Sequence, residues 1–296
     1  MKQLVSDLAK KYDFSSIESR LNELNDLPSI KIGFIGEFSA GKSSLINSIL
    51  DIHLPTSIKP TTKAICLIEP TPGIEQNEFF HEINGERHQV TFREFSEILK
   101  GEKEDVVAAI KVKSCDVLPP GCIFVDTPGI HTVTGNEAEL TNGYLAMLDA
   151  AVVCVNITDG IINKNLLDFI NSKELQHLHK HMVFALTWAD RKSEDDCETI
   201  RQAIVQLLQK EIEAGRFNSD NIDKKVFPIS SVQGNNAEKV YSFLKETVLD
   251  DLPELCRQRQ EAECKIIAKD LLSLLEERLK LSSYNDEELI AAQKEI

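Results

Sequence analysis

Short apolar runs recur through the middle of the chain, and segments with helical spacing separate them. Runs such as IKIGFI, AICLI, AAVVCVN, MVFALT and KVFPIS have the length and composition of buried β-strands. Segments such as ETIRQAIVQLLQKEIEAG instead carry apolar residues at helical intervals. Strands that alternate with helices predict an α/β domain over residues 30–250, with a mostly parallel sheet flanked by helices.

A β-hairpin is predicted in EFFHEINGERHQVTF, which covers residues 78–92. Asn84 and Gly85 supply the two positive-φ positions that a tight hairpin turn needs. FREFSEILKG follows and predicts a short helix that ends at Gly101. Two further strands are predicted on either side of Pro119-Pro120-Gly121.

The two ends of the chain have helical spacing. Residues 1–28 are predicted to be helical, with Leu4, Leu8 and Tyr12 on one spacing and Ile17, Leu21 and Leu24 on another. From Leu252 onward the sequence predicts one long amphipathic helix, whose apolar side carries Ile266, Ile267, Leu271, Leu274 and Leu275. A second helix is predicted to begin at Ser283 or Asn285. No stop signal follows Ile296, so we expect the chain to end within an element.

Composition and charge exclude several classes of protein. The chain has 296 residues, is 42% hydrophobic and carries a formal net charge of −15. This acidic balance argues against nucleic acid as a partner and against direct docking on anionic lipid. No apolar run approaches the ~18 residues of a membrane span, and the N-terminus lacks the apolar centre of a signal peptide. The seven cysteines form no CxxC pair, so we expect reduced core residues in a cytoplasmic protein.

The stretch GEFSAGKS, from Gly36 to Ser43, fits the phosphate-binding pattern G-x-x-x-x-G-K-[ST]. A predicted strand precedes it and a predicted helix follows it. In that context the loop N–H groups and the helix N-terminus can surround a phosphate chain. Lys42 is then expected to reach the β- and γ-phosphates, and Ser43 is expected to bind Mg²⁺.

Three downstream segments, each at the end of a predicted strand, favour GTP over ATP. In IFVDTPG, Asp126 is placed to hold the Mg²⁺ shell, and the Gly129 N–H can bind the γ-phosphate. In VFALTWAD, Asp190 can accept two hydrogen bonds from the edge of guanine, which adenine cannot provide. In VFPISS, Ser230 and Ser231 are suited to contact the guanine O6 through backbone N–H groups.

The order GEFSAGKSS, PTT, DTPG, TWAD and PISS resembles the five guanine-nucleotide motifs of a GTPase. More narrowly, GEFSAGKSSLIN, LPTSIKPTT and LPPGCIFVDTPGI resemble the dynamin superfamily, especially bacterial dynamin-like proteins. The resemblance implies a P-loop GTPase domain over residues 30–250. It also implies a partial helical neck bundle, with N-terminal neck helices in residues 1–29 and C-terminal ones, truncated, in residues 251–296.

The resemblance also assigns residues to roles. The residues expected to bind the nucleotide are Gly36, Ser39, Ala40, Gly41, Lys42, Ser43, Ser44, Thr187, Trp188, Asp190, Ser230 and Ser231. Those expected to bind Mg²⁺ are Ser43, Thr62 and Asp126. Those expected to take part in catalysis are Ser39, Lys42, Thr62 and Gly129.

Two residues depart from the family pattern. Trp188 stands where the fourth motif usually has lysine, so its indole could stack on the base or face a partner, while Asp190 keeps guanine selectivity. Ile130 follows DTPG, where small GTPases place a water-positioning glutamine. The resemblance implies that backbone and a switch threonine hold the water, and that Ser39 offsets charge. Thr62 is the expected threonine, and Thr61 is the alternative.

The activity implied by the resemblance is Mg²⁺-dependent GTP hydrolysis. Pairing of two chains across the nucleotide face, either identical or related dynamin-like chains, is expected to stimulate it. Membrane remodelling, and any peripheral membrane association, would require regions outside this chain. Two alternatives stay open: a GTP-binding switch or scaffold with negligible hydrolysis, and a ribosome-assembly GTPase, against which the acidic balance counts.

Three alternating histidines, His177, His179 and His181, form a separate candidate. On a strand they would share one face and could bind a metal ion. We favour the simpler interpretation, that they form a polar approach to the strand MVFALT.

Overall fold

The computed structural model describes residues 2–23, 30–50, 52–54, 64–71, 73–83, 86–100, 107–113, 122–129, 144–232, 242, 244 and 252–282. Its residues divide into two compact units, one formed by residues 29–252 and one by residues 1–28 together with 253–296.

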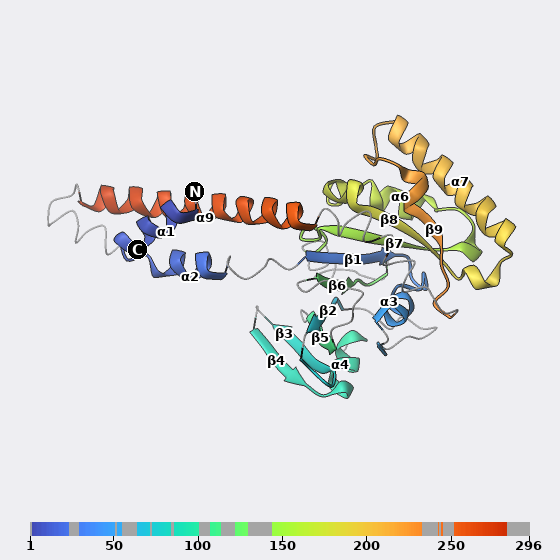
Figure 1. Cartoon of the computed structure of the whole chain (residues 1–296), viewed down its shortest axis with the longest axis horizontal. Helices are drawn as coiled ribbons and strands as arrows, with labels where there is room; N and C mark the ends of the chain where they lie inside the picture. Colours follow the sequence, from blue (N-terminus) through green and yellow to red (C-terminus); the bar gives the residue numbers. More distant parts are fainter. Residues whose placement is uncertain are drawn as a thin grey trace. The chain divides into compact units, whose positions relative to one another are not determined.

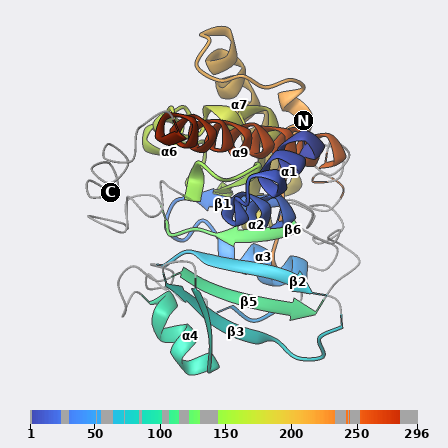
Figure 2. The same cartoon turned by 90° about the vertical axis from the view of Figure 1, so that its left-hand side faces the viewer.

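The larger unit is built on a β-sheet. In the described part of the chain, nine strands pair in the order β4-β3-β5-β2-β6-β1-β7-β8-β9. The strands are β1 (Ile30–Gly36), β2 (Cys66–Thr71), β3 (Glu78–Ile83), β4 (Glu86–Val90), β5 (Val107–Lys113), β6 (Cys122–Asp126), β7 (Ala150–Asn156), β8 (Met182–Thr187) and β9 (Val226–Pro228). Figure 2 shows β3, β5, β2 and β6 side by side in this order.

Strand direction divides the sheet into two parts. Around β1 all pairings are parallel, with β6 on one side and β7, β8 and β9 on the other. β2 runs antiparallel to β6 but parallel to β5, and β3 is antiparallel to both β5 and β4. The predicted mostly parallel α/β sheet is therefore confirmed. The predicted hairpin is β3–β4, and its Asn84-Gly85 turn lies outside the described residues.

Helices accompany the sheet as predicted. They are α3 (Lys42–Leu50), α4 (Phe92–Leu99), α6 (Lys164–Ile170) and α7 (Glu194–Glu213), with 3₁₀ turns η1 (Ile157–Asp159), η2 (Gln176–His181), η3 (Ala189–Arg191) and η4 (Ile222–Lys225). α7 packs beside β9 (Figure 1). Its N-cap Ser193 accepts the Asp196 N–H, and three acidic residues follow in its first turn, where the helix dipole favours negative charge.

The core of this unit lies between the central strands and the helices. Its buried side chains include Ile35, Val125, Val153, Phe184 and Leu208, from β1, β6, β7, β8 and α7. Cys66, Cys122, Cys154 and Cys197 are buried in this unit, Cys264 is buried in the other, and none of the five is in a disulfide. These five thiols agree with the prediction of reduced core cysteines.

The histidine segment forms the 3₁₀ turn η2, so its histidines do not line one face of a strand. His179 is buried; its Nδ1 accepts the Asn218 N–H at 3.1 Å, and its Nε2 donates to the Ile170 carbonyl at 2.8 Å. Burial also lowers the pKa of His179. Among the described residues, no three or more histidine, cysteine, aspartate or glutamate side chains are grouped so that they could hold a metal ion.

The smaller unit contains α1 (Lys2–Lys11), α2 (Ser15–Glu23) and most of α9 (Leu252–Ser282). Its core consists of Val5, Ala9, Ile17, Leu21, Ile267 and Leu271. Arg20 of α2 pairs with Asp270 of α9 at 2.7 Å, although both side chains are substantially exposed. Of the described helices, none combines the length and the apolar composition that crossing a membrane requires.

Two apolar residues noted in the sequence do not lie on the buried faces of these helices, and for Ile266 this corrects the predicted apolar side of α9. Leu4 is 64% exposed, because α1 turns Val5 and Ala9 inward, and the small Ala9 permits close packing. Ile266 is 54% exposed. Cys264, Ile267 and Leu271 lie three and four residues apart and fill the buried face of α9, so Ile266 points about 100° away from Ile267.

Candidate nucleotide-binding site

The loop between β1 and α3, residues 36–43, is called the P-loop below. Gly36 has φ of +154°, and a Cβ atom there would lie 2.4 Å from the Cys154 carbonyl oxygen of β7. Gly41 has φ of +82°, and its carbonyl accepts the Leu45 N–H at 2.8 Å, in the first turn of α3. Glycine is therefore required at Gly36 by close approach of backbone, and at Gly41 by the turn itself.

Lys42, the first residue of α3, is buried although it is charged. Its Nζ donates hydrogen bonds to the carbonyl oxygens of Gly36 at 3.2 Å and Glu37 at 3.0 Å. Burial lowers the pKa of Lys42, and the nearby Asp126 carboxylate opposes this shift by favouring the charged form. The ammonium group therefore lies against the P-loop backbone, where it can neutralise an anion held by the loop.

Asp126, at the end of β6, meets the P-loop at Ser43. The Ser43 hydroxyl donates to Asp126 Oδ2 at 2.5 Å. Asp126 Oδ1 is fully buried and has no hydrogen-bond partner among the described residues. Burial raises the pKa of Asp126 to about 6, even though Lys42 and Ser43 both favour its ionised form. The Ser43 hydroxyl and the Asp126 carboxylate, one oxygen of which has no partner, are hard ligands of the kind that Mg²⁺ prefers.

The residues after Asp126 stay close to the P-loop. The Thr127 hydroxyl donates to the Phe34 carbonyl at 2.7 Å and so ties this segment to β1. A Cβ atom on Gly129 would lie 2.8 Å from the backbone nitrogen of Phe38. Any side chain at position 129 would therefore displace the P-loop backbone or this segment.

At the end of β8, Thr187 joins three elements of the site. Its hydroxyl lies 2.7 Å from the Ala40 carbonyl of the P-loop and 3.1 Å from the Val155 carbonyl of β7. Thr187 is almost completely buried, at 1% exposure. The P-loop is therefore fixed against β7 and β8 by one hydroxyl group.

Trp188 and Asp190 follow at the start of η3. The Trp188 indole N–H donates to the Ser39 carbonyl at 3.4 Å, and the Arg191 guanidinium lies 4.1 Å from the centre of the indole ring. Asp190 is exposed. The Ala189 N–H donates to Ile229 O at 3.2 Å, which holds η3 against the segment that follows β9.

A cavity of about 350 Å³ is lined by residues of α3 and of the segments that follow α3, β8 and β9. Its lining brings together six of the predicted nucleotide-binding residues: Gly41, Ser44, Thr187, Trp188, Asp190 and Ser231. Ser230 is buried beside it, and its hydroxyl accepts the Val232 N–H at 3.1 Å. Ser39 and Ala40 adjoin the cavity through their bonds to Trp188 and Thr187.

Several lining residues were not predicted from the sequence. They are Asn47, Ser48, Ile52, His53 and Val232. Ser44, Asn47 and Ser48 lie three and four residues apart on α3, so the helical spacing of polar residues could have indicated two of them. Asn47 also bonds both the N–H and the carbonyl of Leu54, which fixes the chain beside Ile52 and His53.

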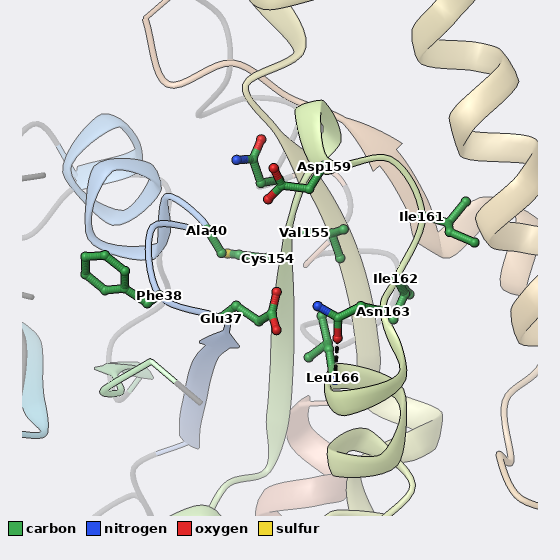
Figure 3. A pocket seen from close by; sticks show the side chains of 11 residues that line it. Glu37, Phe38, Ala40, Cys154, Val155, Asp159, Ile161, Ile162, Asn163 and Leu166 are labelled. Carbon is green, nitrogen blue, oxygen red and sulfur yellow. Dashed lines mark hydrogen bonds between the residues drawn. The ribbon is translucent and has the colours of Figure 1, made fainter. Parts of the chain in front are cut away.

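A second, smaller cavity of about 60 Å³ borders the P-loop at Glu37 and Phe38. Figure 3 shows Glu37 of the P-loop facing Asn163, which begins α6. The Asn163 side chain accepts the Leu166 N–H at 2.9 Å and so caps that helix. This cavity is a poor match for a nucleotide, because it is small and because the Asn163 side chain already caps α6. The switch candidates Thr61 and Thr62, and Ile130, lie outside the described residues.

Comparison with known proteins agrees with this geometry. A family profile described as the dynamin family matches residues 32–189. The transmembrane GTPase Marf of Drosophila melanogaster is 25% identical over 214 residues, which cover 68% of this chain and 26% of Marf. An uncharacterized protein encoded in the xynA 3′ region of Caldicellulosiruptor sp. (strain Rt8B.4) is 25% identical over 205 residues, or 67% of this chain and 48% of that protein.

Two solved structures of an oligomerised bacterial dynamin pair, described as a mechanism for long-range sensing and tethering of membranes, share the fold. One matches with a TM-score of 0.53 and 19% identity, covering 95% of this chain and 56% of the other. The second matches with a TM-score of 0.51 and 17% identity, covering 99% and 58%. This chain thus spans about a quarter to about half of the curated relatives' own length.

The parallel strands around β1, the P-loop and the residues that follow β6 and β8 define a P-loop GTPase domain. The profile match covers more than half of the chain and identifies the family as well. The chain belongs to the dynamin family of GTPases.

Proposed function

We propose that this chain binds GTP and GDP and hydrolyses GTP in a Mg²⁺-dependent reaction. The observation that carries this proposal is the arrangement of Ser43, Asp126 and Lys42. A serine hydroxyl and an otherwise unpartnered buried carboxylate oxygen adjoin a buried ammonium group, all at one P-loop. Mg²⁺, when bound, would supply positive charge to the phosphate oxygens.

The residues of this chain divide the work of phosphate binding. Lys42 exchanges its bonds to the loop carbonyls for bonds to phosphate oxygens, because an ammonium group is attracted more strongly to a charged oxygen than to a neutral carbonyl. Ser43 and Asp126 hold the metal ion, and the Gly129 N–H contacts the γ-phosphate. Ser39 offsets charge near the reacting bond. Such catalysis rests on positioning and electrostatics more than on covalent chemistry.

Guanine selectivity is proposed to reside in Asp190. Its exposed carboxylate lines the larger cavity and can accept two hydrogen bonds from a guanine edge. Ser230 and Ser231 lie at the same cavity, where backbone N–H groups can meet the guanine O6.

Hydrolysis is proposed to require closure of the segment that contains Thr62, with Thr61 as the alternative, over the phosphates. Closure costs chain entropy, so a partner surface that favours the closed state would raise turnover. We propose that the partner is a second copy or a related dynamin-like chain that pairs across the nucleotide face. The oligomerised bacterial dynamin pair shares this fold and supports the idea.

The assignments outside the GTPase domain are proposals of the same kind. Residues 1–29 and 251–296 would form part of a neck, and membrane remodelling would be carried out by the full protein through regions outside this chain. The protein would be cytoplasmic, with peripheral membrane association in its full-length form. A GTP-binding switch with negligible hydrolysis is the second candidate, because Ile130 replaces a water-positioning glutamine.

Phosphate release under single-turnover conditions, from nanomolar to tens of micromolar protein, tests the proposal. We expect Mg²⁺-dependent release whose rate per molecule rises with protein concentration. Ser43→Ala should bind nucleotide without this Mg²⁺ dependence, while Ser48→Ala, on the same helix, should behave as wild type in Mg²⁺ dependence. Tight GTP binding with no release at any concentration would favour the switch.

A further inference from the structure

Trp188 holds a backbone conformation that bulky residues rarely adopt, with φ of 62° and ψ of 27°. Two backbone bonds close the turn around it, from Ala189 N–H to Ile229 O at 3.2 Å and from Arg191 N–H to Trp188 O at 3.0 Å. The preceding Thr187 is anchored to the P-loop. A bulky residue held in such a conformation by its surroundings suggests a use for its side chain.

Two contacts hold the indole ring of Trp188, one at its edge and one over its face. Its Nε1–H donates to the Ser39 carbonyl at 3.4 Å, so the ring reaches across to the P-loop. The Arg191 guanidinium carbon lies 4.1 Å from the ring centre, within the range of a cation–π contact. The half-buried ring borders the 350 Å³ cavity together with Asp190 and Ser231.

We propose that Trp188 and Arg191 form a purine platform: the guanine base stacks on the indole, and Arg191 covers the other face of the ring and holds it in place. This inference rests on the proposed function, because it names how the same cavity recognises its base. Arg191 acts as a positioning residue, since it touches the indole and not the ligand.

The platform follows from the physical chemistry of the three groups. An aromatic ring can stack on any base, because every base offers a π-face. A guanidinium group is planar and stacks on aromatic rings, whereas an ammonium group on a flexible stem does not. The turn and the Arg191 contact order the indole before the base arrives, so binding does not have to pay for that ordering.

If the platform contacts only the base, its loss should change the affinities for GDP, GTP and pyrophosphate in a specific pattern. GDP and GTP carry the same base, so loss of the platform should weaken both equally. Pyrophosphate carries no base, so its binding at the P-loop should be unaffected. An indole that merely supported the P-loop through Ser39 would weaken pyrophosphate binding as well.

The experiment measures GDP, GTP and pyrophosphate binding by calorimetry for the whole chain and its variants. Trp188→Ala should weaken the binding of GDP and of GTP about tenfold, which is the typical effect of removing one base–aromatic stack. Trp188→Phe should recover most of this loss. Arg191→Ala should weaken both nucleotides about two- to fivefold, as expected for an exposed cation–π contact. Arg191→Lys should recover only part of the Arg191→Ala loss, because the ammonium keeps the cation–π attraction but lacks the plane that stacks on the indole.

Lys192→Ala is the matched control. Lys192 is the next residue in the chain, also an exposed cation, with extended backbone at φ −130° and ψ 157°. Because it is not stacked on the indole, its removal should leave all three affinities unchanged. Equal losses in Lys192→Ala and Arg191→Ala would reduce the effect to net charge and overturn the role of Arg191.

Trp188 is the only tryptophan in the sequence, so its fluorescence reports on the platform directly. GDP should quench it and pyrophosphate should not. Nucleotide that binds by calorimetry without quenching, and with equal affinity for wild type and Trp188→Ala, would overturn the platform while leaving the proposed function intact. Failure of the wild-type chain to bind GDP at all would instead remove the proposed function.

Discussion

The two halves of the nucleotide-binding site differ in where they keep their charges. In the phosphate half, formed by the P-loop and residues 126–129, Lys42 and Asp126 are 7% and 2% exposed. In the base half, formed by residues 187–190 and 230–231, the one carboxylate, Asp190, is exposed. Burying a charge costs free energy unless the charge is paired. In the phosphate half, a bound ligand and its metal ion can reduce this cost by interacting with Lys42 and Asp126. The base half has no buried carboxylate and recognises the base by hydrogen bonding and by its shape.

The two halves should therefore respond to different changes. Ligand binding at the phosphate half should depend on charge and on pH. Binding at the base half should depend on hydrogen-bond pattern and on stacking.

Lys42→Ala should weaken GDP binding about 100-fold or more, because it removes a buried charge-assisted donor and leaves Asp126 without its compensating cation. Calorimetric titration with GDP measures the change. Lys225→Ala is the matched control: Lys225 is also buried, and its Nζ donates to the Lys180 carbonyl at 2.6 Å and the Ser219 hydroxyl at 2.9 Å. That control should lower stability and leave GDP affinity unchanged. An unaltered dissociation constant in Lys42→Ala would refute the P-loop assignment.

Asp190→Asn should weaken GDP binding roughly 100-fold and strengthen the binding of xanthosine diphosphate. The reason is that the amide can donate a hydrogen bond to the xanthine O2, whereas the carboxylate can only accept one. Competition binding with the two nucleotides measures the ratio. Pyrophosphate affinity should stay constant, since the phosphate half is untouched. Should ATP bind the wild-type chain as tightly as GTP, Asp190 would lose its role.

Asp126→Asn should stabilise the nucleotide-free chain at neutral pH. Folding raises the pKa of Asp126 from 3.8 to about 6, so the folded chain holds this proton more tightly than the unfolded chain. The resulting stability is present below pH 3.8 and lost as the pH rises through 6. Denaturant unfolding at neutral pH should show a gain of about 3 kcal/mol in the free energy of unfolding for Asp126→Asn, with a flatter pH dependence.

The same variant should lose Mg²⁺-dependent nucleotide binding, since an amide oxygen is a weaker ligand than a carboxylate. Stability and function would then change in opposite directions, as expected where a site stores unfavourable electrostatics. A variant less stable than wild type at neutral pH would show that the burial cost of this carboxylate is already compensated.

Thr187→Val should have the smallest effect and should act on both halves. It removes the hydroxyl shared by the Ala40 and Val155 carbonyls, so the free energy of unfolding should fall by about 1 kcal/mol. GDP and pyrophosphate affinities should fall together by a few-fold. Thr187→Ser keeps the hydroxyl and serves as the control. Loss of GDP binding alone would place Thr187 in the base half only.

Local patterns in the sequence predicted most of the fold. The buried strands β1, β2, β5, β6, β7 and β8 each lie in a contiguous apolar run, and the hairpin and the long helix α9 carry their own signals. The antiparallel pairing of β2 with β6 could not be predicted, because strand direction depends on how a distant crossover passes the sheet. The inward face of α1 could not be predicted either, because Val5 and Leu4 are both apolar and only packing decides which of them is buried.

The site shows the same limit. GEFSAGKS, DTPG and TWAD are contiguous motifs, so their residue types indicate their chemistry directly. The contact between Thr187 and Ala40 joins residues 147 positions apart, and no local pattern contains it. The stacking of Arg191 on Trp188 depends on a left-handed backbone at Trp188, which the type of residue argues against.

The antiparallel seam between β2 and β6 also bears on protein engineering. Beyond it lie β5, β3 and β4, and the edge strand β4 is mostly exposed, with Glu86, Arg87, His88 and Gln89 on its surface. Polar and charged side chains on an edge strand discourage unwanted strand pairing. Because no residue of β3 or β4 lines the nucleotide cavity, this edge is the natural attachment point for a dye, a surface anchor or an inserted reporter domain. The opposite edge would be a poor choice, since β9 leads directly into Ser230 and Ser231 at the cavity.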